Sequence, residues 1–486
     1  MPRRLLSLLV VLCLVGGCVG HTSAQRVEDR PPNVIFILAD DLGYGELGCY
    51  GQEQIETPHI DALAEQGMRF TDAYSGAPVC APARCVLLTG QHLANGQVRS
   101  NREIQPEGQL PLTADVPTVA MLMQQAGYAT AAMGKWGLGP VGSTGDPNAK
   151  GFDLFFGYNC QRQAHTYYPG HLWRNDERIE LNGGNAIPGH ARLQQGETTF
   201  DRFYGDDYAP DFILDAAKGF VRAHQDQPFF LYLALVEPHL AMQPPQEWVD
   251  HYPEEWDAAP YPGGRGYTPH PRPRAGYAAM ISDLDEHVGE IVALIEELGL
   301  ADDTIIIFTS DNGATHDVGG VDTTFFNSAG PLRGRKGSVF EGGLRVPMVV
   351  RWPGVVEPGT VTDHQTCFQD LMATMAELTD QDAPDTSDGI SYLPLLTGEG
   401  EQRQHDYLVW EFHGYGGQKA VRMGDWKAVM RDIHNGNAEV LLFNLADDIG
   451  EQSNVAADHP EIVAEARAIF ENDRTVNEHF PMEAFD

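Results

Sequence analysis

The sequence NVIFILADDLGYG at residues 33–45 joins a continuous apolar run to a pair of acidic residues. Every position from 34 to 38 is apolar, which is typical of a β-strand covered on both faces, as in parallel sheets. Asp40 and Asp41 follow at the carboxyl end of this predicted strand. Ligands of open parallel sheets bind outside the carboxyl ends of the strands, so the stretch predicts both a fold class and one part of a site.

Strand-like runs alternate with helical patterns beyond this stretch. Apolar residues recur at helical spacing from about residue 277 to 298, and Thr57 and Pro58 form a typical start for a helix that ends near Gly67. Further elements are predicted as a helix at 117–126, strands at 128–133, 229–236, 304–308 and 346–350, and a loop at 260–274. We therefore expect an α/β fold with a large, mostly parallel mixed sheet sandwiched by helices.

The C-terminal part of the chain follows a different pattern. Short strands are predicted at residues 407–411, 419–422, 426–430 and 440–443, followed by a helix at 460–472. An acidic, polar stretch at 381–388 precedes them. The expected organisation is a signal at 1–25, a main domain at 31–385, and a smaller subdomain at 386–486 with a short antiparallel sheet and a helix.

The charge balance excludes one class of partner. The chain of 486 residues carries 32 basic and 69 acidic residues, a net charge of −37, which would repel nucleic acid. An anionic ligand would therefore need a locally basic pocket.

The N-terminus is typical of an export signal. Arg3 and Arg4 precede an apolar run at 5–15 that is too short to span a bilayer stably. Two processing routes remain open: VGGC at 15–18 resembles a lipoprotein box that would leave a lipid anchor on Cys18, and TSA at 22–24 resembles an ordinary cleavage site. An exported protein is expected, whether periplasmic, lipid-anchored or secreted. No other segment is long and apolar enough to cross a membrane.

The cysteine count points to an unpaired or modified cysteine. Of seven cysteines, five lie beyond the signal, and an odd number cannot all pair. They form no Cys-x-x-Cys motif, so neither a disulfide scaffold nor a zinc site is indicated.

Polar motifs follow four of the predicted strands. ADD at 39–41, GKW at 134–136, EPH at 237–239 and DNG at 311–313 each stand at a strand's carboxyl end. Each alone is common in turns and caps. Together they predict one rim of the sheet, where three carboxylates and an amide oxygen suit calcium or magnesium better than zinc.

The sequence CAPARCVLLTG at residues 80–90 resembles the signature of the formylglycine-dependent (type I) sulfatases, which belong to the alkaline phosphatase superfamily. The motifs already quoted resemble that family's metal and sulfate motifs in order, as do GRK at 334–336, EGGLRVP at 341–347 and the stretch 444–454. The match covers nearly the whole chain beyond the signal. It implies that a formylglycine-generating enzyme oxidises Cys80 to formylglycine (3-oxoalanine) before folding, while the peptide is extended.

The resemblance also implies a role for each matching residue. The calcium ligands would be Asp40, Asp41, Asp311 and Asn312, together with an oxygen of the modified Cys80. Arg84 would hold the formylglycine, and Lys135 and Lys336 would contact the sulfate. His239 would stand beside the leaving oxygen, and either His239 or Lys336 would donate the proton that an alcohol leaving group requires. The formylglycine hydrates to a diol that attacks sulfur and later expels sulfate.

The chain departs from the family pattern at Gly137. The family commonly has GKWHLG, whose histidine helps sulfate to leave, whereas residues 134–139 read GKWGLG. His165 is the substitute candidate, with a surface loop histidine as the alternative, and Gln161 falls near a position where relatives contact sulfate.

The substrate is expected to be a sulfated carbohydrate or an aryl sulfate. An aromatic and basic stretch could hold a sugar or could simply pack in the core: Tyr167, Tyr168, His171, Trp173 and Arg174. Two alternative functions remain open, namely a phosphoester or phosphonate hydrolase of the same superfamily, and a catalytically impaired glycan-binding relative.

Overall fold

A ten-stranded sheet forms the centre of the described chain, which comprises residues 30–264 and 266–486 of a computed structural model. Its five middle strands are all parallel and lie in the order β9 (Thr304–Ser310), β1 (Asn33–Ala39), β8 (Phe229–Ala234), β4 (Ala129–Lys135) and β5 (Leu154–Tyr158). These strands include three predicted at 128–133, 229–236 and 304–308. The predicted α/β class with a mostly parallel mixed sheet is confirmed.

Strands of mixed direction complete the two edges of the sheet. Beyond β9 lie β10 (Met348–Arg351), β2 (Met68–Phe70) and β11 (Thr360–Thr362), with β10 antiparallel to both of its neighbours. Beyond β5 lie the antiparallel strands β6 (His171–Arg174) and β7 (Glu177–Glu180). A separate two-stranded sheet joins β3 (Ala73–Tyr74) to β12 (Thr366–Cys367).

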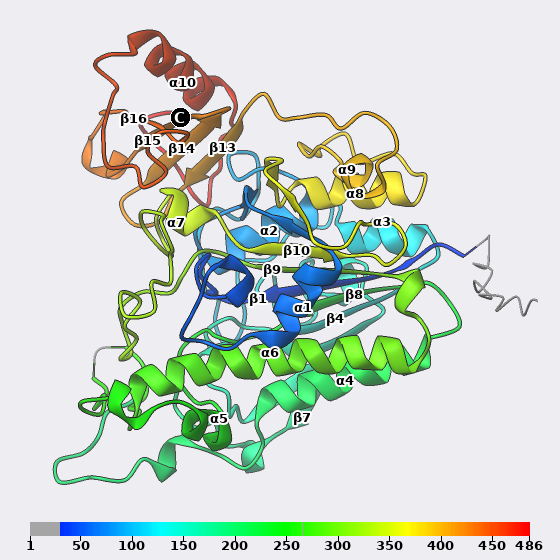
Figure 1. Cartoon of the computed structure of the whole chain (residues 1–486), viewed down its shortest axis with the longest axis vertical. Coiled ribbons are helices and arrows are strands. Elements are labelled where there is room, and N and C mark those ends of the chain that lie inside the picture. Colours follow the sequence, from blue (N-terminus) through cyan, green and yellow to red (C-terminus); the bar gives the residue numbers. More distant parts are fainter. Residues whose placement is uncertain (1–29, 265) are drawn as a thin grey trace, which may run out of the picture. The chain divides into compact units, whose positions relative to one another are not determined.

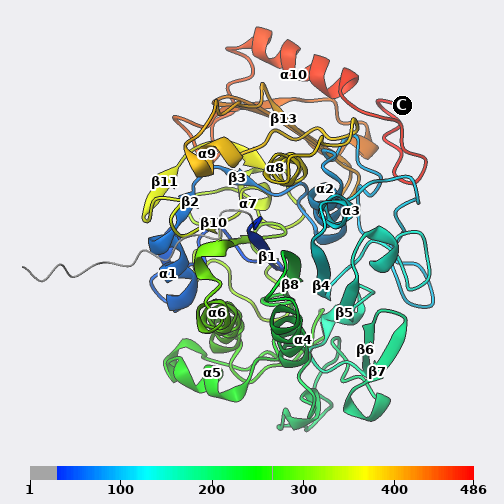
Figure 2. The same ribbon diagram turned by 90° about the vertical axis from the view of Figure 1, so that its right-hand side faces the viewer.

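Helices cover both faces of the central sheet (Figure 2). On one face, Ile35 and Ile37 of β1 pack in a core shared with α1 (Pro58–Gln66), α4 (Ala209–Ala223) and α6 (Pro273–Glu297). On the other face, the alternate residues of β1 pack in a core shared with α2 (Cys80–Thr89), α3 (Val119–Gln125) and α8 (Asp370–Leu378). The continuous apolar run of β1 is thus explained by burial on both sides.

The C-terminal segment carries a second sheet (Figure 1). Its four antiparallel strands are β13 (Leu408–Phe412), β14 (Gln418–Met423), β15 (Trp426–Met430) and β16 (Leu441–Asn444), as predicted. The helix α10 (Pro460–Asn472) packs Ala466 and Phe470 in a core shared with this sheet. Pro32–Asp486 forms one compact unit, so the boundary predicted at 385/386 stays a prediction.

Some elements differ from the expectations. The predicted helices at 57–67 and 117–126 are confirmed as α1 and α3, but α6 begins at Pro273, inside the predicted loop 260–274, because proline is well suited to the first turn of a helix. Helices α2 and α4 were not predicted. Three short α-helices are also present in the described chain: α5 (Gln246–His251), α7 (Glu341–Leu344) and α9 (Leu393–Thr397).

The N-terminal signal and the processing sites at 15–18 and 22–24 lie outside the described residues. Within the described ranges, no helix has both the length and the apolar character needed to cross a bilayer.

A buried histidine anchors the loop before α6 and gives a pH-dependent stability. His270 is fully buried, and its Nδ1 accepts a hydrogen bond from the backbone of Arg272 at 3.1 Å. Burial lowers the pKa of His270 to about 4. Between the ordinary pKa of about 6.5 and pH 4, the unfolded chain binds a proton that the folded chain does not, so stability falls as the pH falls.

Replacing this histidine is expected to flatten that dependence. His270→Asn keeps an acceptor near Arg272 but cannot titrate, so its free energy of unfolding should fall by about 3 kcal/mol less than wild type between pH 7 and pH 4. Urea unfolding at a series of pH values measures the difference. Parallel pH profiles for the two proteins would contradict the assignment.

Candidate active site

Four predicted motifs meet at one rim of the central sheet. β1 lies between β8 and β9, and backbone hydrogen bonds continue past the strand ends, from Asp40 N to Glu237 O at 3.0 Å and from Asp311 N to Ala39 O at 2.9 Å. Lys135 is the last residue of β4, the other neighbour of β8. The parallel order of these strands therefore collects residues that are far apart in the sequence.

Cys80 is the first residue of α2, and every residue of this helix is buried. Its Sγ lies 3.4 Å from Oδ1 of Asp40. Pro82 is accommodated because the first turn of a helix needs no N–H donor there. Burial, together with the nearby carboxylates of Asp311 and Asp40, raises the pKa of the Cys80 thiol. An unmodified thiol would therefore stay protonated here and would be a poor nucleophile.

Arg84 stands one helical turn after Cys80 and is fully buried. It donates hydrogen bonds to Oδ2 of Asp311 and to the backbone oxygen of Lys135, both at 2.7 Å, and it lies 3.6 Å from Asp40. Arg84 thereby fixes the start of α2 against the ends of β4 and β9.

Two lysines pair with the adjacent acidic residues. Nζ of Lys135 pairs with Oδ2 of Asp40, and Nζ of Lys336 lies 2.7 Å from Oδ2 of Asp41. With Arg84 and Asp311, the cluster contains three cationic and three carboxylate side chains. Burial would raise the pKa of Asp40, but the surrounding cations lower it well below its usual range. Burial and the charge of Asp40 raise the pKa of Asp311 to about 6.

The donor atoms fit a hard divalent cation. Ligand atoms of Asp40, Asp41, Cys80 and His239 all lie within 4.8 Å of one another. Oδ1 of Asn312 is buried without a hydrogen-bond partner in the described chain, while its Nδ2 donates to Oδ1 of Asp41 at 2.8 Å. A buried amide oxygen without a partner is costly, and a cation at this point would satisfy it. Carboxylate and amide oxygens favour calcium or magnesium.

His239 lies beside this cluster in a fixed orientation. Its Nδ1 lies 2.6 Å from the oxygen of Leu240, and its Nε2 lies 3.7 Å from Oδ2 of Asp41. The hydroxyl of Tyr167 donates to the oxygen of His239 at 2.7 Å, which holds this loop in place. Burial, with the charges of Lys336 and Lys135, lowers the pKa of His239 to about 4.

Gln161 occupies the space beside Gly137. Gly137 has a φ of 91°, and a Cβ built there would lie 2.5 Å from Nε2 of Gln161. The left-handed backbone disfavours a larger residue at position 137, and the side chain of Gln161 would have to shift to make room for one. Gln161 itself is buried.

Gly137→Ala is expected to destabilise the protein by about 2 kcal/mol, because it combines a left-handed backbone with a steric clash. In a Gln161→Ala background, the loss of stability caused by Gly137→Ala should shrink to the part that comes from the left-handed backbone. A double-mutant cycle measured by urea unfolding gives the coupling energy between positions 137 and 161. Gly142 has a φ of 74° with open space around it, so Gly142→Ala is the matched control. Equal costs of Gly137→Ala in both backgrounds would contradict the packing argument.

His165 also reaches this region, in a short 3-10 helix at Gln163–His165. Its ring stacks on that of His239, with the centroids 4.9 Å apart. Two residues near it were not predicted, His190 and Tyr267, whose rings stack 4.8 Å apart. Both belong to irregular loops with no motif to signal them.

The aromatic stretch at 167–174 ranges from buried to exposed, with His171 and Trp173 half-buried and Arg174 exposed. Tyr167 and Tyr168 are buried, as the core-packing interpretation expects. His171 and Trp173 both contact the carboxylate of Glu107, with Trp173 Nε1 donating at 2.7 Å.

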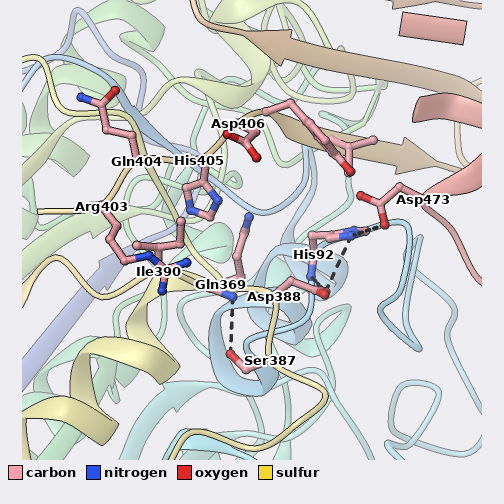
Figure 3. Close-up of a pocket in the computed structure, with 13 residues that line it drawn as sticks. His92, Gln369, Ser387, Asp388, Ile390, Arg403, Gln404, His405, Asp406 and Asp473 are labelled. Atoms are coloured by element: carbon pink, nitrogen blue, oxygen red, sulfur yellow. Dashed lines mark hydrogen bonds and ion pairs between the residues drawn. The ribbon is translucent and has the colours of Figure 1, made fainter. Parts of the chain in front are cut away.

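A separate cavity of about 340 Å³ lies away from the site (Figure 3). In its wall, Nε2 of His92 pairs with Oδ1 of Asp473 at 3.3 Å, and His405 and Asp388 also line it. None of the predicted site residues lines this cavity.

Comparison with known proteins relates the chain and its fold to sulfatases. The family described as Sulfatase matches residues 32–381, and the family described as N-sulphoglucosamine sulphohydrolase, C-terminal, matches residues 335–470. An N-acetylgalactosamine-6-O-sulfatase from Bacteroides thetaiotaomicron is 31% identical over 97% of this chain and 99% of its own length. Human arylsulfatase A is 31% identical over 89% of this chain and 86% of its own length. The crystal structure of Ps i-CgsB in complex with k-i-k-neocarrahexaose matches with a TM-score of 0.74 and 27% identity, covering 92% of this chain and 94% of that chain.

Proposed function

The chain belongs to the sulfatase family, whose members hydrolyse sulfate esters, and we propose that it removes sulfate from a sulfated carbohydrate by means of a formylglycine made from Cys80 and a bound calcium ion. The observation that carries the proposal is the position of Cys80. Its side chain is buried beside Asp40 within the cluster of three carboxylates and three cations. As a thiol it would be inert there, whereas the sequence around it resembles the modification signature of formylglycine-dependent sulfatases.

The charges of the cluster suit a sulfate ester. Asp40, Asp41 and Asp311 balance Arg84, Lys135 and Lys336, so a divalent cation would leave a local excess of positive charge. This excess would attract an anionic ester in spite of the net charge of −37 on the whole chain.

Each residue of this cluster would then have its own role in the reaction. Asp40, Asp41, Asp311 and Asn312 would hold the calcium ion, which supplies Lewis-acid stabilisation of the charge on the sulfate oxygens. The formylglycine supplies a diol oxygen as nucleophile. Arg84 would orient position 80, and Lys135 and Lys336 would exchange part of their carboxylate contacts for the sulfate. Lys336, which stays charged, would be the proton donor to the leaving oxygen. His239 would stand beside that oxygen and would be the other candidate only once its Nε2 is protonated, because its neutral ring uses the Nδ1 hydrogen for Leu240. Gln161 would be a weaker sulfate contact.

The proposed substrate class is supported by relatives. The first relative is named for a sulfated amino sugar, and Ps i-CgsB was solved with a neocarrahexaose. An aryl sulfate remains the second candidate, because arylsulfatase A is similarly related. Export, with a lipid anchor at Cys18 or without one, and maturation by a formylglycine-generating enzyme complete the proposal.

The phosphonate alternative has a neighbour among the solved structures, at the level of the fold. A phosphonate monoester hydrolase of Agrobacterium radiobacter matches with a TM-score of 0.64 at 22% identity, which reflects a shared fold. The cysteine at position 80 with Pro82 and Arg84 favours sulfate.

Two measurements on protein made with a formylglycine-generating enzyme test the proposal. The first is the mass of the peptide that contains Cys80, and the second is the rate of hydrolysis of a sulfate ester and of the matching phosphate ester. We expect replacement of the thiol sulfur by an aldehyde oxygen, and faster hydrolysis of the sulfate ester. An unchanged thiol in active enzyme would overturn the proposed nucleophile, and preference for the phosphate ester would overturn the reaction class.

A further inference from the structure

A chain of hydrogen bonds connects His165 to the backbone through a second histidine. Nδ1 of His165 lies 2.9 Å from Nε2 of His190, and Nδ1 of His190 lies 2.6 Å from the oxygen of Gly266. The loop that carries His190 is fixed nearby by Thr268, whose backbone N donates to the oxygen of Gly189 at 3.0 Å. The pair is therefore built into two joined loops.

The direction of these hydrogen bonds determines the protonation of both rings. A carbonyl oxygen can only accept, so Nδ1 of His190 carries a hydrogen and its Nε2 is an acceptor in the neutral ring. Nδ1 of His165 must then donate, which leaves the lone pair of His165 on Nε2. The proton on Nδ1 is thus assigned by its partner, as in histidines whose second nitrogen is held by a neighbouring group.

His165 also belongs to the active site by position. It stacks on His239 at an interplanar angle of 26°, and the positive charges of Lys135 and Lys336 act on it. Burial and the nearby positive charges lower the pKa of His165, so the ring is neutral before a substrate binds. A bound sulfate ester would offset the charges of the lysines, which otherwise weaken Nε2 as a proton acceptor. In both stacked rings Nδ1 is engaged in a hydrogen bond. The partner of His239 is the backbone oxygen of Leu240.

Position 137 cannot supply a base. It is a glycine with a left-handed backbone, and Gln161 fills the space in front of it. His165, whose ring stacks on that of His239, is an imidazole of this region that no other proposed role occupies.

We propose that His165 is the base that releases sulfate and that His190 is its positioning residue, which keeps the proton on Nδ1 of His165 and the lone pair on Nε2. The inference rests on the proposed function. In the sulfated diol at position 80, Nε2 of His165 takes the proton of the remaining free hydroxyl. The electron pair of that O–H bond forms the C=O bond of the aldehyde, and sulfate leaves with the electron pair of the broken C–O bond. The proton then passes from His165 to water.

The first experiment reads the tautomer without catalysis. The whole chain is made with ¹⁵N-labelled histidine and an unmodified Cys80, and the His165 signals are assigned by comparison with His165→Gln. We expect Nδ1 to be protonated in wild type and in His190→Gln, whose amide oxygen can accept the same hydrogen bond. His190→Leu should show a measurable fraction protonated on Nε2. An Nε2–H tautomer in wild type, or an unchanged tautomer in His190→Leu, would overturn the role of His190.

The second experiment uses matured enzyme and a sulfate ester. His165→Gln should lower kcat by about 10²–10⁴-fold with a much smaller change in KM. His190→Leu should lower kcat by about 10–100-fold, and His190→Gln should recover most of this loss. His224→Gln is the control, because His224 lies at the end of α4 with Nδ1 bound to Phe220 O at 2.8 Å and has no part in the site. A folded His165→Gln enzyme within threefold of the wild-type kcat would overturn the role of the base.

The activity of the matured wild-type enzyme distinguishes failure of the His165 assignment from failure of the proposed function. If matured wild type hydrolyses the ester while His165→Gln is unimpaired, the inference fails alone. If wild type with an aldehyde at position 80 is inert, the proposed function fails and the base with it, whereas the tautomer measurement still decides whether His190 positions His165.

Discussion

Cys80→Ala lowers kcat/KM for a sulfate ester by at least about 10⁴-fold in the expected outcome, because alanine cannot be oxidised to the aldehyde that supplies the nucleophile. The fold should tolerate the change. Alanine is favourable in a helix, and the buried thiol makes one weak contact with Asp40. Steady-state kinetics on protein made with a formylglycine-generating enzyme measures the loss, and circular dichroism checks the fold.

Cys85→Ala is the matched control for this experiment. Cys85 lies on the same helix and is also fully buried, but its sulfur packs in the core. Its replacement should cost about 1 kcal/mol of stability and leave kcat/KM within a few fold of wild type. If Cys80→Ala and Cys85→Ala had similar activity, the nucleophile would have to be sought elsewhere.

Burial on both faces made the central strands predictable from the sequence, but it left their direction in the sheet undetermined. β1, β8 and β9 are buried on both faces, so each contains a continuous run of apolar residues that stands out in the sequence. Such a run carries no sign of direction. β10 therefore was predicted as a strand, but its antiparallel pairing with β9 follows from the connection through residues 311–347 and not from its own residues.

The helix α2 illustrates a structural limit. Every residue from Cys80 to Thr89 is buried, so the sequence has no polar face from which a helical period can be recognised. The helix α4 is different, because Ile213, Leu214, Ala217, Phe220 and Val221 are spaced as in an amphipathic helix and could have been found.

Some residues of the candidate site were predictable from the sequence and others were not. Residues that follow strands, such as Asp40 and Asp311, were predictable because a parallel sheet brings strand ends together. His190 and Gly266 lie on irregular loops, where sequence spacing does not determine spatial neighbours. Their contact with His165 depends on how the two loops join, which only the structure describes.

Asp40→Asn is the second variant with a large expected effect, on both activity and stability. Asp40 is fully buried and pairs with Lys135, so loss of its charge leaves two carboxylates against three cations. Breaking a buried pair should cost about 3 kcal/mol in calcium-free protein. We expect kcat/KM to fall by about 10³-fold, because a proposed metal ligand and the alignment of Lys135 would be lost together.

Calcium titration separates these two losses. Calcium at about 100 times its Kd should raise the free energy of unfolding of wild type by about 2.7 kcal/mol, and this gain should largely disappear in Asp40→Asn. Asp370→Asn is the matched control, since Asp370 is also buried and pairs with His405 at 2.7 Å, away from the strand ends that form the site. It should lose stability but keep the calcium response. A full calcium response in Asp40→Asn would show that the cation binds elsewhere, and the carboxylates at the strand ends would then serve only as partners of the lysines.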